Sequence, residues 1–325
     1  MPLALPRGAQ PVRSGAVLAG RYEIVRPLGS GGMGSVLEAI DIADGAPVAL
    51  KLLHRELASD PVHVERFVRE GQALAGLEHP AIVRVRACGP LEDGGLFLAM
   101  DLVRGETLQR FLRRRGPMSV ETLGPIVRDL ALGLFYAHER GVVHRDLKPS
   151  NVMLVAARDA DAPTGATLID FGVATSSGAS RLTQVGEYVG TPRYMAPEQL
   201  SGTSTEDARA DLYALGVVAY EALAGDSPFP CDAGLGPMMS AVLRGESAPL
   251  RVRRPDVPPA LAHVIARAMT LRPEHRFATA LELLDAWDGA VRPLDRAAPA
   301  TIPMAIVAPS SAPPRHSFVR TRPGG

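Results

Sequence analysis

The chain contains few cysteines and few aromatic residues. Its 325 residues include two cysteines, one tryptophan and 5% aromatic residues in all. Cys88 and Cys231 lie far apart and have no partners at a metal-ligand spacing, so they predict neither a disulfide framework nor a zinc site. Two such thiols indicate a reducing compartment, and we expect a cytoplasmic protein.

The chain also has no excess of charge and no long apolar run. Thirty-five Lys and Arg residues balance 35 Asp and Glu residues, which argues against general attraction to nucleic acid or to an anionic membrane. No segment approaches about 18 uninterrupted apolar residues, the length of a spanning helix. Residues 1–20 lack the basic start and apolar core of a signal peptide. We therefore expect a soluble protein that binds neither nucleic acid nor membrane.

The most informative motifs are His-Arg-Asp-Leu-Lys-Pro-Ser-Asn at residues 144–151 and Asp-Phe-Gly at residues 170–172. They place an acid, a cation, an amide and a second acid where phosphoryl transfer from a nucleotide to a hydroxyl needs them. Asp146 can hold and deprotonate the attacking hydroxyl, and Lys148 can neutralise charge on the phosphate. Asn151 and Asp170 offer the hard oxygen ligands that magnesium prefers. The structural alternative is a turn, in which such side chains cap the backbone.

Residues 28–36 form a glycine-rich run, Leu-Gly-Ser-Gly-Gly-Met-Gly-Ser-Val. Such a run also occurs in dinucleotide-binding turns and in flexible loops. A dinucleotide site needs glycines that open a helix, but residues 36–41 and 48–52 read as two strands joined by a turn at Asp44-Gly45. The run also lacks the Gly-Lys-Ser/Thr ending of a Walker loop. We expect its bare backbone to fold over nucleotide phosphates, with Val36 packed on the adenine.

Lys51 ends the predicted strand Val-Ala-Leu-Lys. Alternation puts Ala49 on the same face, where it is small enough to admit a base while Lys51 reaches the phosphates. Glu70 falls on the apolar face of the next predicted helix, residues 64–74, where a carboxylate indicates a cationic partner. The alternative for Glu70 is a solvated position on an ordinary surface helix.

Because these motifs occur in the order of the protein-kinase signature, the chain resembles the bacterial eukaryotic-like (Hanks-type) serine/threonine protein kinases. The resemblance covers roughly residues 21–287. It implies an α+β, bilobal fold, with a small lobe of mainly antiparallel β-sheet and one key helix, and a mainly helical large lobe. The implied division is a flexible extension at 1–20, a kinase domain at 21–289 (small lobe about 21–100, large lobe about 104–289), and a Pro/Ala/Arg-rich tail at 290–325. We expect this tail to be disordered.

The resemblance also implies the cofactors and their contacts. ATP with Mg, or Mn, is expected, and Lys51 should pair with Glu70. Met100 should line the back of the adenine pocket, while Asp101 and Val103 offer backbone groups to the base. The implied nucleotide-binding residues are Leu28, Gly29, Gly31, Gly34, Val36, Ala49, Lys51, Met100, Asp101 and Val103.

The segment between Asp-Phe-Gly and Ala-Pro-Glu at residues 196–198 is rich in Ser, Thr and Gly. Thr183 resembles the activation-loop phosphosite of the family, and Arg145 would bind its phosphate. Thr191 is expected to bond Asp146 and Lys148. The alternative for this segment is a flexible loop with incidental hydroxyls.

Two further contacts are expected in the large lobe. Glu198 should pair with Arg276 by resemblance. Asp211 begins an apolar predicted helix, where an Asp commonly caps the backbone. The resemblance adds that Asp211 braces the backbone of the catalytic loop, and both roles are compatible.

We expect a serine/threonine kinase that phosphorylates proteins, including its own activation segment, with a homodimer as one route to phosphorylation between copies. Lys148, two residues after Asp146, matches the serine/threonine branch. A pseudokinase scaffold is disfavoured because Lys51, Asp146 and the two metal-binding residues are all present. A small-molecule phosphotransferase is disfavoured by the activation segment and by residues 196–198.

Overall fold

The computed structural model describes residues 13–31, 34–53, 61–92, 94–156, 162–171, 192–203, 207–232 and 234–292. The side chains of Ser30, residues 61–63, Arg66, Arg69 and Glu70 also lie outside the description. Contacts divide the chain into Met1–Val291 and Arg292–Gly325. Every element named below belongs to the first of these units.

An antiparallel six-stranded sheet dominates the N-terminal part. Its strands are β1 (Val17–Leu18), β2 (Tyr22–Gly31), β3 (Gly34–Asp41), β4 (Pro47–Leu53), β5 (Val85–Pro90) and β6 (Leu96–Asp101). Their order is β1-β2-β3-β4-β6-β5. The predicted turn joins β3 to β4, where Gly45 has a φ of 72° that glycine adopts without a steric cost. The glycine-rich run joins β2 to β3, as expected for a loop between two strands.

The first strand corrects the predicted N-terminal boundary. Val17–Leu18 pairs with β2, inside residues 1–20, which were expected to form a flexible extension. The chain reverses between them because Ala19 and Gly20 have φ angles of 50° and 62°. Gly20 adopts this left-handed conformation without a steric cost, whereas alanine adopts it rarely.

Side chains alternate between the two faces of this sheet. Val48 and Leu50 belong to one apolar cluster, whereas Ala49 and Leu53 belong to the main core. The face that carries Ala49 therefore also carries Lys51, as the period of two predicts. Helix α2 (Pro61–Ala75) packs against β5.

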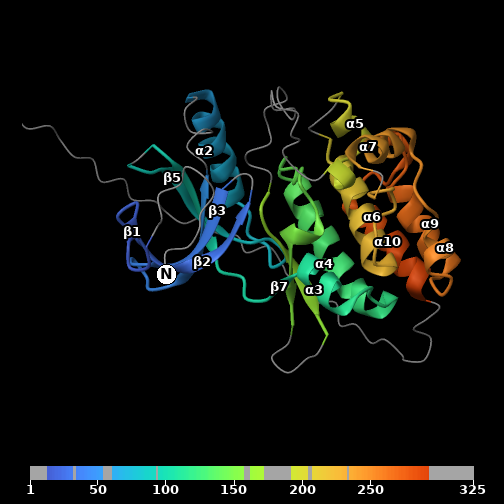
Figure 1. Cartoon of the computed structure of the whole chain (residues 1–325), viewed down its shortest axis with the longest axis horizontal. Coiled ribbons are helices and arrows are strands. Elements are labelled where there is room, and N and C mark those ends of the chain that lie inside the picture. Colours follow the sequence, from blue (N-terminus) through green and yellow to red (C-terminus); the bar gives the residue numbers. More distant parts are fainter. Residues whose placement is uncertain are drawn as a thin grey trace, which may run out of the picture. The chain divides into compact units, whose positions relative to one another are not determined.

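A three-stranded antiparallel sheet and a set of helices form the rest of the described chain. Its strands are β7 (Glu106–Thr107), β8 (Val152–Val155) and β9 (Gly165–Leu168), in the order β7-β8-β9. The α-helices are α3 (Leu108–Arg115), α4 (Val120–His138), α5 (Pro197–Leu200), α6 (Arg209–Ala224), α7 (Leu235–Arg244), α8 (Leu250–Arg253), α9 (Pro259–Ala268) and α10 (Ala280–Val291). The 3-10 helices are η1 (Pro149–Asn151), η2 (Pro192–Tyr194) and η3 (Pro273–His275). Figure 1 shows α2 beside the strands of the first sheet and α3 to α10 as a second group.

Helix α6 is the centre of the helical part. Its residues are buried on almost all sides, and it packs against α4 and α9, as its almost uniformly apolar sequence predicts. Helix α4 begins after Ser119, whose hydroxyl accepts a hydrogen bond from Thr122 N at 3.2 Å, and it ends shortly before Gly141. Within the described ranges, no helix combines the length and apolar character needed to cross a membrane.

Candidate active site

The loop that precedes η1 is held by a single buried carboxylate. Asp211 Oδ2 accepts a hydrogen bond from His144 N, and its Oδ1 accepts one from Arg145 N, both at 2.8 Å. Asp211 Oδ2 also lies 2.8 Å from His138 Nε2. Helix α6 begins at Arg209 after Ala208, so this carboxylate serves the loop instead of capping its own helix. Bracing of the catalytic loop is therefore confirmed, and the capping role is not observed.

The charge of Asp211 is favoured despite its burial. Burial alone raises the pKa of this carboxyl, but the hydrogen bond and charge of His138 and the amide of His144 outweigh it. The net pKa of Asp211 lies below its ordinary value. A charged acceptor strengthens the bonds that hold the loop.

His144 connects the catalytic loop to the segment that carries Asp170. Its ring Nε2 lies 3.2 Å from Ile169 O and its Nδ1 lies 3.4 Å from Asp146 N. A carbonyl can only accept and an amide can only donate, so the ring is neutral with its proton on Nε2. Burial lowers the pKa of His144, which agrees with this form. Its ring also packs on Phe171, with centroids 4.4 Å apart.

Three of the predicted catalytic residues form one hydrogen-bonded cluster. Lys148 Nζ donates to Asp146 Oδ2 at 2.7 Å. Asn151 Nδ2 donates to Asp146 O at 2.8 Å and to Asp146 Oδ2 at 3.1 Å. All three side chains come from the short stretch 146–151, which runs from this loop through η1 and limits their freedom relative to one another. The cluster fixes the carboxylate of Asp146 between a cation and an amide.

Lys51 meets the second predicted acid across the fold. Its Nζ lies 2.9 Å from Asp170 Oδ1, although 119 positions separate the two residues in the chain. Asp170 has a φ of 56° and Arg145 a φ of 64°. Non-glycine residues rarely adopt such angles, which concentrate at functional sites where surrounding contacts enforce them.

The predicted nucleotide residues of the sheet lie on neighbouring strands. Gly29, Val36, Lys51, Leu98 and Cys88 are successive cross-strand partners on β2, β3, β4, β6 and β5, and we call these five residues the Lys51 row. The adjacent pair Ala49 and Met100 are cross-strand partners and are 8% and 4% exposed.

Two residues of the glycine-rich run differ in their surroundings. Leu28 is 41% exposed. A Cβ on Gly34 would lie 1.9 Å from Leu52 O, so the backbone of β4 leaves no space for any other residue.

The end of β6 is tied through Arg86 to the end of β3 and to the turn between β3 and β4. Arg86 Nε lies 2.5 Å from Asp101 Oδ1, and Arg86 Nη1 lies 2.8 Å from Asp44 Oδ2 and 3.8 Å from Asp41 Oδ2. The N–H of Asp101 donates to Arg84 O at 2.9 Å. The N–H of Asp101 is therefore already paired and is not offered to a base.

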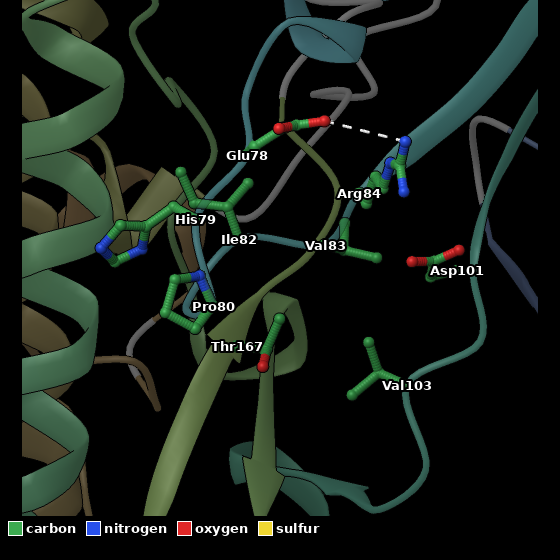
Figure 2. Close-up of a pocket in the computed structure, with 9 residues that line it drawn as sticks. All are labelled: Glu78, His79, Pro80, Ile82, Val83, Arg84, Asp101, Val103 and Thr167. Carbon is green, nitrogen blue, oxygen red and sulfur yellow. Dashed lines mark ion pairs between the residues drawn. The ribbon is translucent and has the colours of Figure 1, made fainter. Parts of the chain in front are cut away.

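A hollow of about 480 Å³ borders the linker (Figure 2). Its lining comes from the loop after α2, the linker and β9, namely Glu78, His79, Pro80, Ile82, Val83, Arg84, Asp101, Val103 and Thr167. None of these residues belongs to the catalytic loop or to β4. The hollow is therefore distinct from the place where Lys51 meets Asp170.

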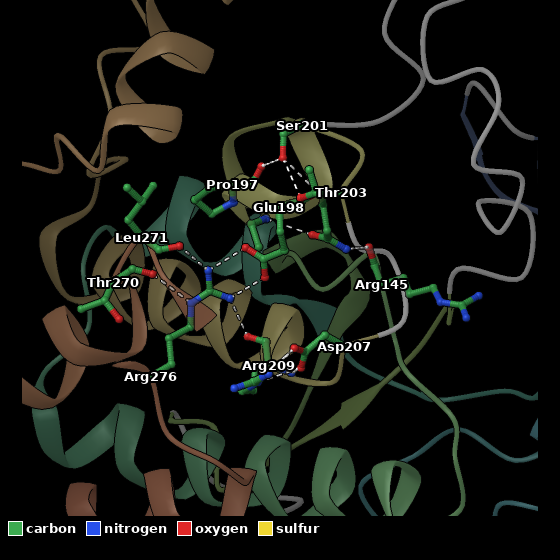
Figure 3. Close-up of polar contacts among 12 residues, drawn as sticks. Arg145, Pro197, Glu198, Ser201, Thr203, Asp207, Arg209, Thr270, Leu271 and Arg276 are labelled. Atoms are coloured by element: carbon green, nitrogen blue, oxygen red, sulfur yellow. Dashed lines mark hydrogen bonds and ion pairs between the residues drawn. The ribbon is translucent and has the colours of Figure 1, made fainter. Parts of the chain in front are cut away.

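Glu198 and Arg276 form a buried ion pair (Figure 3), which confirms that prediction. Arg276 Nη1 and Nη2 donate to Glu198 Oε1 and Oε2 at 2.6 and 2.7 Å. Its other three N–H groups donate to the carbonyl oxygens of Thr270, Arg209 and Leu271 at 2.9 to 3.1 Å.

Some of the predicted residues lie outside the described part, and the motifs missed some residues near the site. Thr183 and Thr191 lie outside the described residues, as does the side chain of Glu70, so their contacts stay predictions. Sequence reasoning did not single out His138 or Gln199, whose Nε2 lies 3.5 Å from Arg145 O. A signal for His138 existed, because it ends the helix that leads into the catalytic loop.

Comparison with known families decides the assignment. The family model for the protein kinase domain matches residues 22–287. The chain belongs to the protein kinase family. The kinase is 38% identical to serine/threonine-protein kinase PknA of Mycobacterium tuberculosis over 331 residues, which cover 96% of the kinase and 74% of PknA. It is 40% identical to PknH of the same species over 275 residues, which cover 85% of the kinase but only 42% of PknH.

A solved structure agrees with this assignment. The kinase domain of Mycobacterium tuberculosis PknI matches with a TM-score of 0.69 and 33% identity, covering 86% of the kinase and 99% of that chain. The predicted α+β, bilobal kinase fold is thus confirmed. The kinase is a serine/threonine protein kinase of the bacterial type. Its family acts on proteins and uses ATP with a divalent metal ion.

The donor set of the site fits such an ion. Among the described residues, no three His, Cys, Asp or Glu side chains gather as a metal site. Asn151 turns its amide nitrogen to Asp146, and its Oδ1 accepts a long hydrogen bond from Ser150 Oγ at 3.4 Å. One amide oxygen and one carboxylate, that of Asp170, suit magnesium, which keeps waters and substrate phosphates among its ligands.

Proposed function

We propose that the kinase transfers the γ-phosphoryl group of ATP to Ser or Thr hydroxyls of proteins, with Asp146 receiving the hydroxyl proton. The contact of Lys51 with Asp170 at 2.9 Å supports this proposal most directly. It brings the cation expected to hold the phosphates beside the acid expected to hold the metal.

The reaction follows from the cluster around Asp146. The acceptor oxygen attacks the γ-phosphorus, its proton passes to an Asp146 carboxylate oxygen, and the bond to the β–γ bridging oxygen breaks to release ADP. Lys148 Nζ lies 2.7 Å from Asp146 Oδ2, next to the group in transfer. The protein contributes position and charge and forms no covalent intermediate.

Asn151 and Asp170 would hold Mg, or Mn. Both supply hard oxygen atoms, and the hydrogen bonds from Asn151 to Asp146 orient the amide for this task. The bound ion neutralises charge on the phosphates. Lys51, oriented by Glu70, would hold the α and β phosphates.

The remaining nucleotide contacts come from the sheet and the linker. The proposed set consists of Leu28, Gly29, Gly31, Gly34, Val36, Ala49, Met100, Asp101 and Val103. The order of the strands supports it, since Gly29, Val36 and Lys51 are cross-strand neighbours.

Regulation would act through the segment before Ala-Pro-Glu. A phosphate on Thr183, added by the kinase itself within a homodimer, would bind Arg145, while Thr191 would bond Asp146 and Lys148. We propose a kinase domain at about residues 21–289 and a cytoplasmic location, the latter because both thiols are free.

Phosphate incorporation from labelled ATP with Mg tests the function. Wild type and Asp146→Asn are compared with the protein itself and with myelin basic protein as acceptors, and nucleotide binding is measured for both. Incorporation on Ser and Thr that disappears in the variant, while nucleotide binding persists, is the expected result. A wild type that binds nucleotide but transfers nothing would favour the pseudokinase scaffold.

A further inference from the structure

Helix α2 touches the first sheet at a point where one glycine leaves no spare space. A Cβ on Gly71 would lie 2.4 Å from Cys88 Sγ and 2.9 Å from Cys88 Cβ. Atoms of this kind do not approach so closely, so with a larger residue at position 71 either Cys88 must shift or α2 must move away from β5. Glycine is unfavourable inside a helix. The close approach to Cys88 gives a physical reason for its presence here.

The cysteine contacts the same helix through its thiol. Cys88 Sγ lies 3.7 Å from Val68 O, within reach of a weak S–H hydrogen bond to the helix backbone. Burial raises the pKa of the Cys88 thiol, which keeps the proton needed for this bond. A small side chain thus both sets the approach of α2 and bonds to it.

This contact falls on the Lys51 row. Cys88 is the cross-strand partner of Leu98, which in turn is the partner of Lys51. Leu98 Cδ1 would lie 3.8 Å from a Cβ on Gly71, so the helix rests directly on this row. A displacement of α2 at residue 71 would therefore change its distance from the strands that carry Lys51.

We propose that Gly71 and Cys88 are positioning residues that set the separation between α2 and the Lys51 row. The inference rests on the proposed function, in which Glu70, the neighbour of Gly71, orients Lys51. Neither Gly71 nor Cys88 touches the reacting atoms, and both act through the distance between the helix and the sheet.

Gly71→Ala tests this role, with Gly124→Ala as the matched control. Gly124 lies inside helix α4 and a Cβ there would meet nothing within 4 Å. We expect kcat/KM for ATP to fall by about 10- to 100-fold in Gly71→Ala, the range that small misplacements of active-site groups produce. Equilibrium binding of a fluorescent ATP analogue should weaken as well. Gly124→Ala should match wild type in both measurements.

Graded rescue separates this role from a loss of folding. Adding Cys88→Gly to Gly71→Ala removes both clashing atoms and should restore kcat/KM to within about threefold of the Cys88→Gly variant alone, since the overpacking is gone. Adding Cys88→Ala removes the sulfur but keeps the Cβ at 2.9 Å, so it should restore only part. Melting temperatures, measured in parallel, show whether each variant is folded at the assay temperature.

Each other outcome counts against the proposal. If Gly71→Ala kept the wild-type kcat/KM and nucleotide affinity, the space between α2 and β5 would accommodate the added methyl group. A lower melting temperature with unchanged kinetics would show that the contact contributes to stability alone. If Cys88→Gly did not restore kcat/KM, Cys88 would not be the residue that sets the separation. If wild type transfers no phosphate, the proposed function fails, but the binding measurements with rescue still decide this inference.

Discussion

The carboxylate of Glu198 and the guanidinium of Arg276 meet through two parallel hydrogen bonds of 2.6 and 2.7 Å. The Arg276 side chain is 0% exposed and that of Glu198 is 8% exposed. With three carbonyl oxygens as further acceptors, every N–H group of this guanidinium has a partner. The pair joins the start of α5 to the loop after η3.

Arg276→Met should destabilise the kinase strongly. The change leaves the Glu198 charge buried without its partner, a loss of about 3–5 kcal/mol. Chemical denaturation monitored by circular dichroism measures the free energy of unfolding. Arg276→Lys should also destabilise, because an ammonium has three donors and cannot match five acceptors. The exposed pair of Arg244 and Glu246 is the control, and equal effects of Arg244→Ala and Arg276→Met would contradict the prediction.

Stability should fall as pH drops below about 6.5, the ordinary pKa of histidine. Burial lowers the pKa of His144 in the folded chain, so the unfolded chain binds the proton first. The contribution of neutral His144 to the free energy of unfolding is present above pH 6.5. It is lost as the pH falls, by up to about 1.4 kcal/mol per pH unit. Denaturation at pH 7.5, 6.5 and 5.5 measures the slope. The slope should be shallower in His144→Asn, and an identical slope would mean that His144 is not responsible.

Asp211→Asn should lower kcat while leaving KM for ATP nearly unchanged. Both carboxylate oxygens accept hydrogen bonds from backbone N–H groups of the catalytic loop. The asparagine side chain replaces one of these oxygens with an NH2 group, which would then face a backbone N–H donor. We expect a fall in kcat of about 10- to 100-fold from the displaced loop. Asp207→Asn is the control, since the Asp207 carboxylate bonds only to Arg209 among the described residues. A comparable fall in that control would point to general destabilisation.

Gly34→Ala should destabilise the first sheet. The added methyl group would overlap Leu52 O, 1.9 Å away, and overpacking of this kind costs about 1–3 kcal/mol or more. Gly29→Ala is the matched comparison, because a Cβ there meets nothing within 4 Å. Thermal unfolding without nucleotide should show a lower melting temperature for Gly34→Ala only. Equal melting temperatures would show that β3 and β4 can separate at this point.

Asn151→Ala should raise the Mg concentration needed for half-maximal activity. The change removes one proposed metal ligand and both hydrogen bonds to Asp146. We expect kcat to fall by about 100-fold. Initial rates at saturating ATP across a Mg titration measure both effects. A lower kcat with an unchanged Mg requirement would limit Asn151 to orienting Asp146.

The sequence predicted the elements whose side chains repeat with a clear period. Strand β4 alternates between two apolar clusters, and α6 is apolar on nearly all sides. The pattern of apolar residues is therefore enough to predict both elements. Pairs carried by a family motif, such as Glu198 with Arg276, were predicted for a different reason. The motif fixes their positions in the fold even though 78 positions separate them in the chain.

Contacts that depend on how the helices and strands pack could not be predicted from the sequence. Gly71 and Cys88 carry no motif, and their meeting depends on the angle at which α2 crosses the sheet. His138 and Asp211 meet only because α4 and α6 pack together. The β1 hairpin was not predicted although Gly20 is a typical turn residue, because the two residues of β1, Val17–Leu18, are too few to show an alternating pattern.

The three acids around Arg86 bear on how the two lobes can move. Arg86 bonds Asp101, the last residue of β6, and Asp44, in the turn between β3 and β4. These ion pairs hold the end of β6 against the turn between β3 and β4. A rotation between the lobes would have to bend the chain after this residue, at 102–105. Gly105 ends that stretch, and a Cβ there would lie 2.3 Å from Leu154 O, so the bending chain is confined to the three residues between two fixed points.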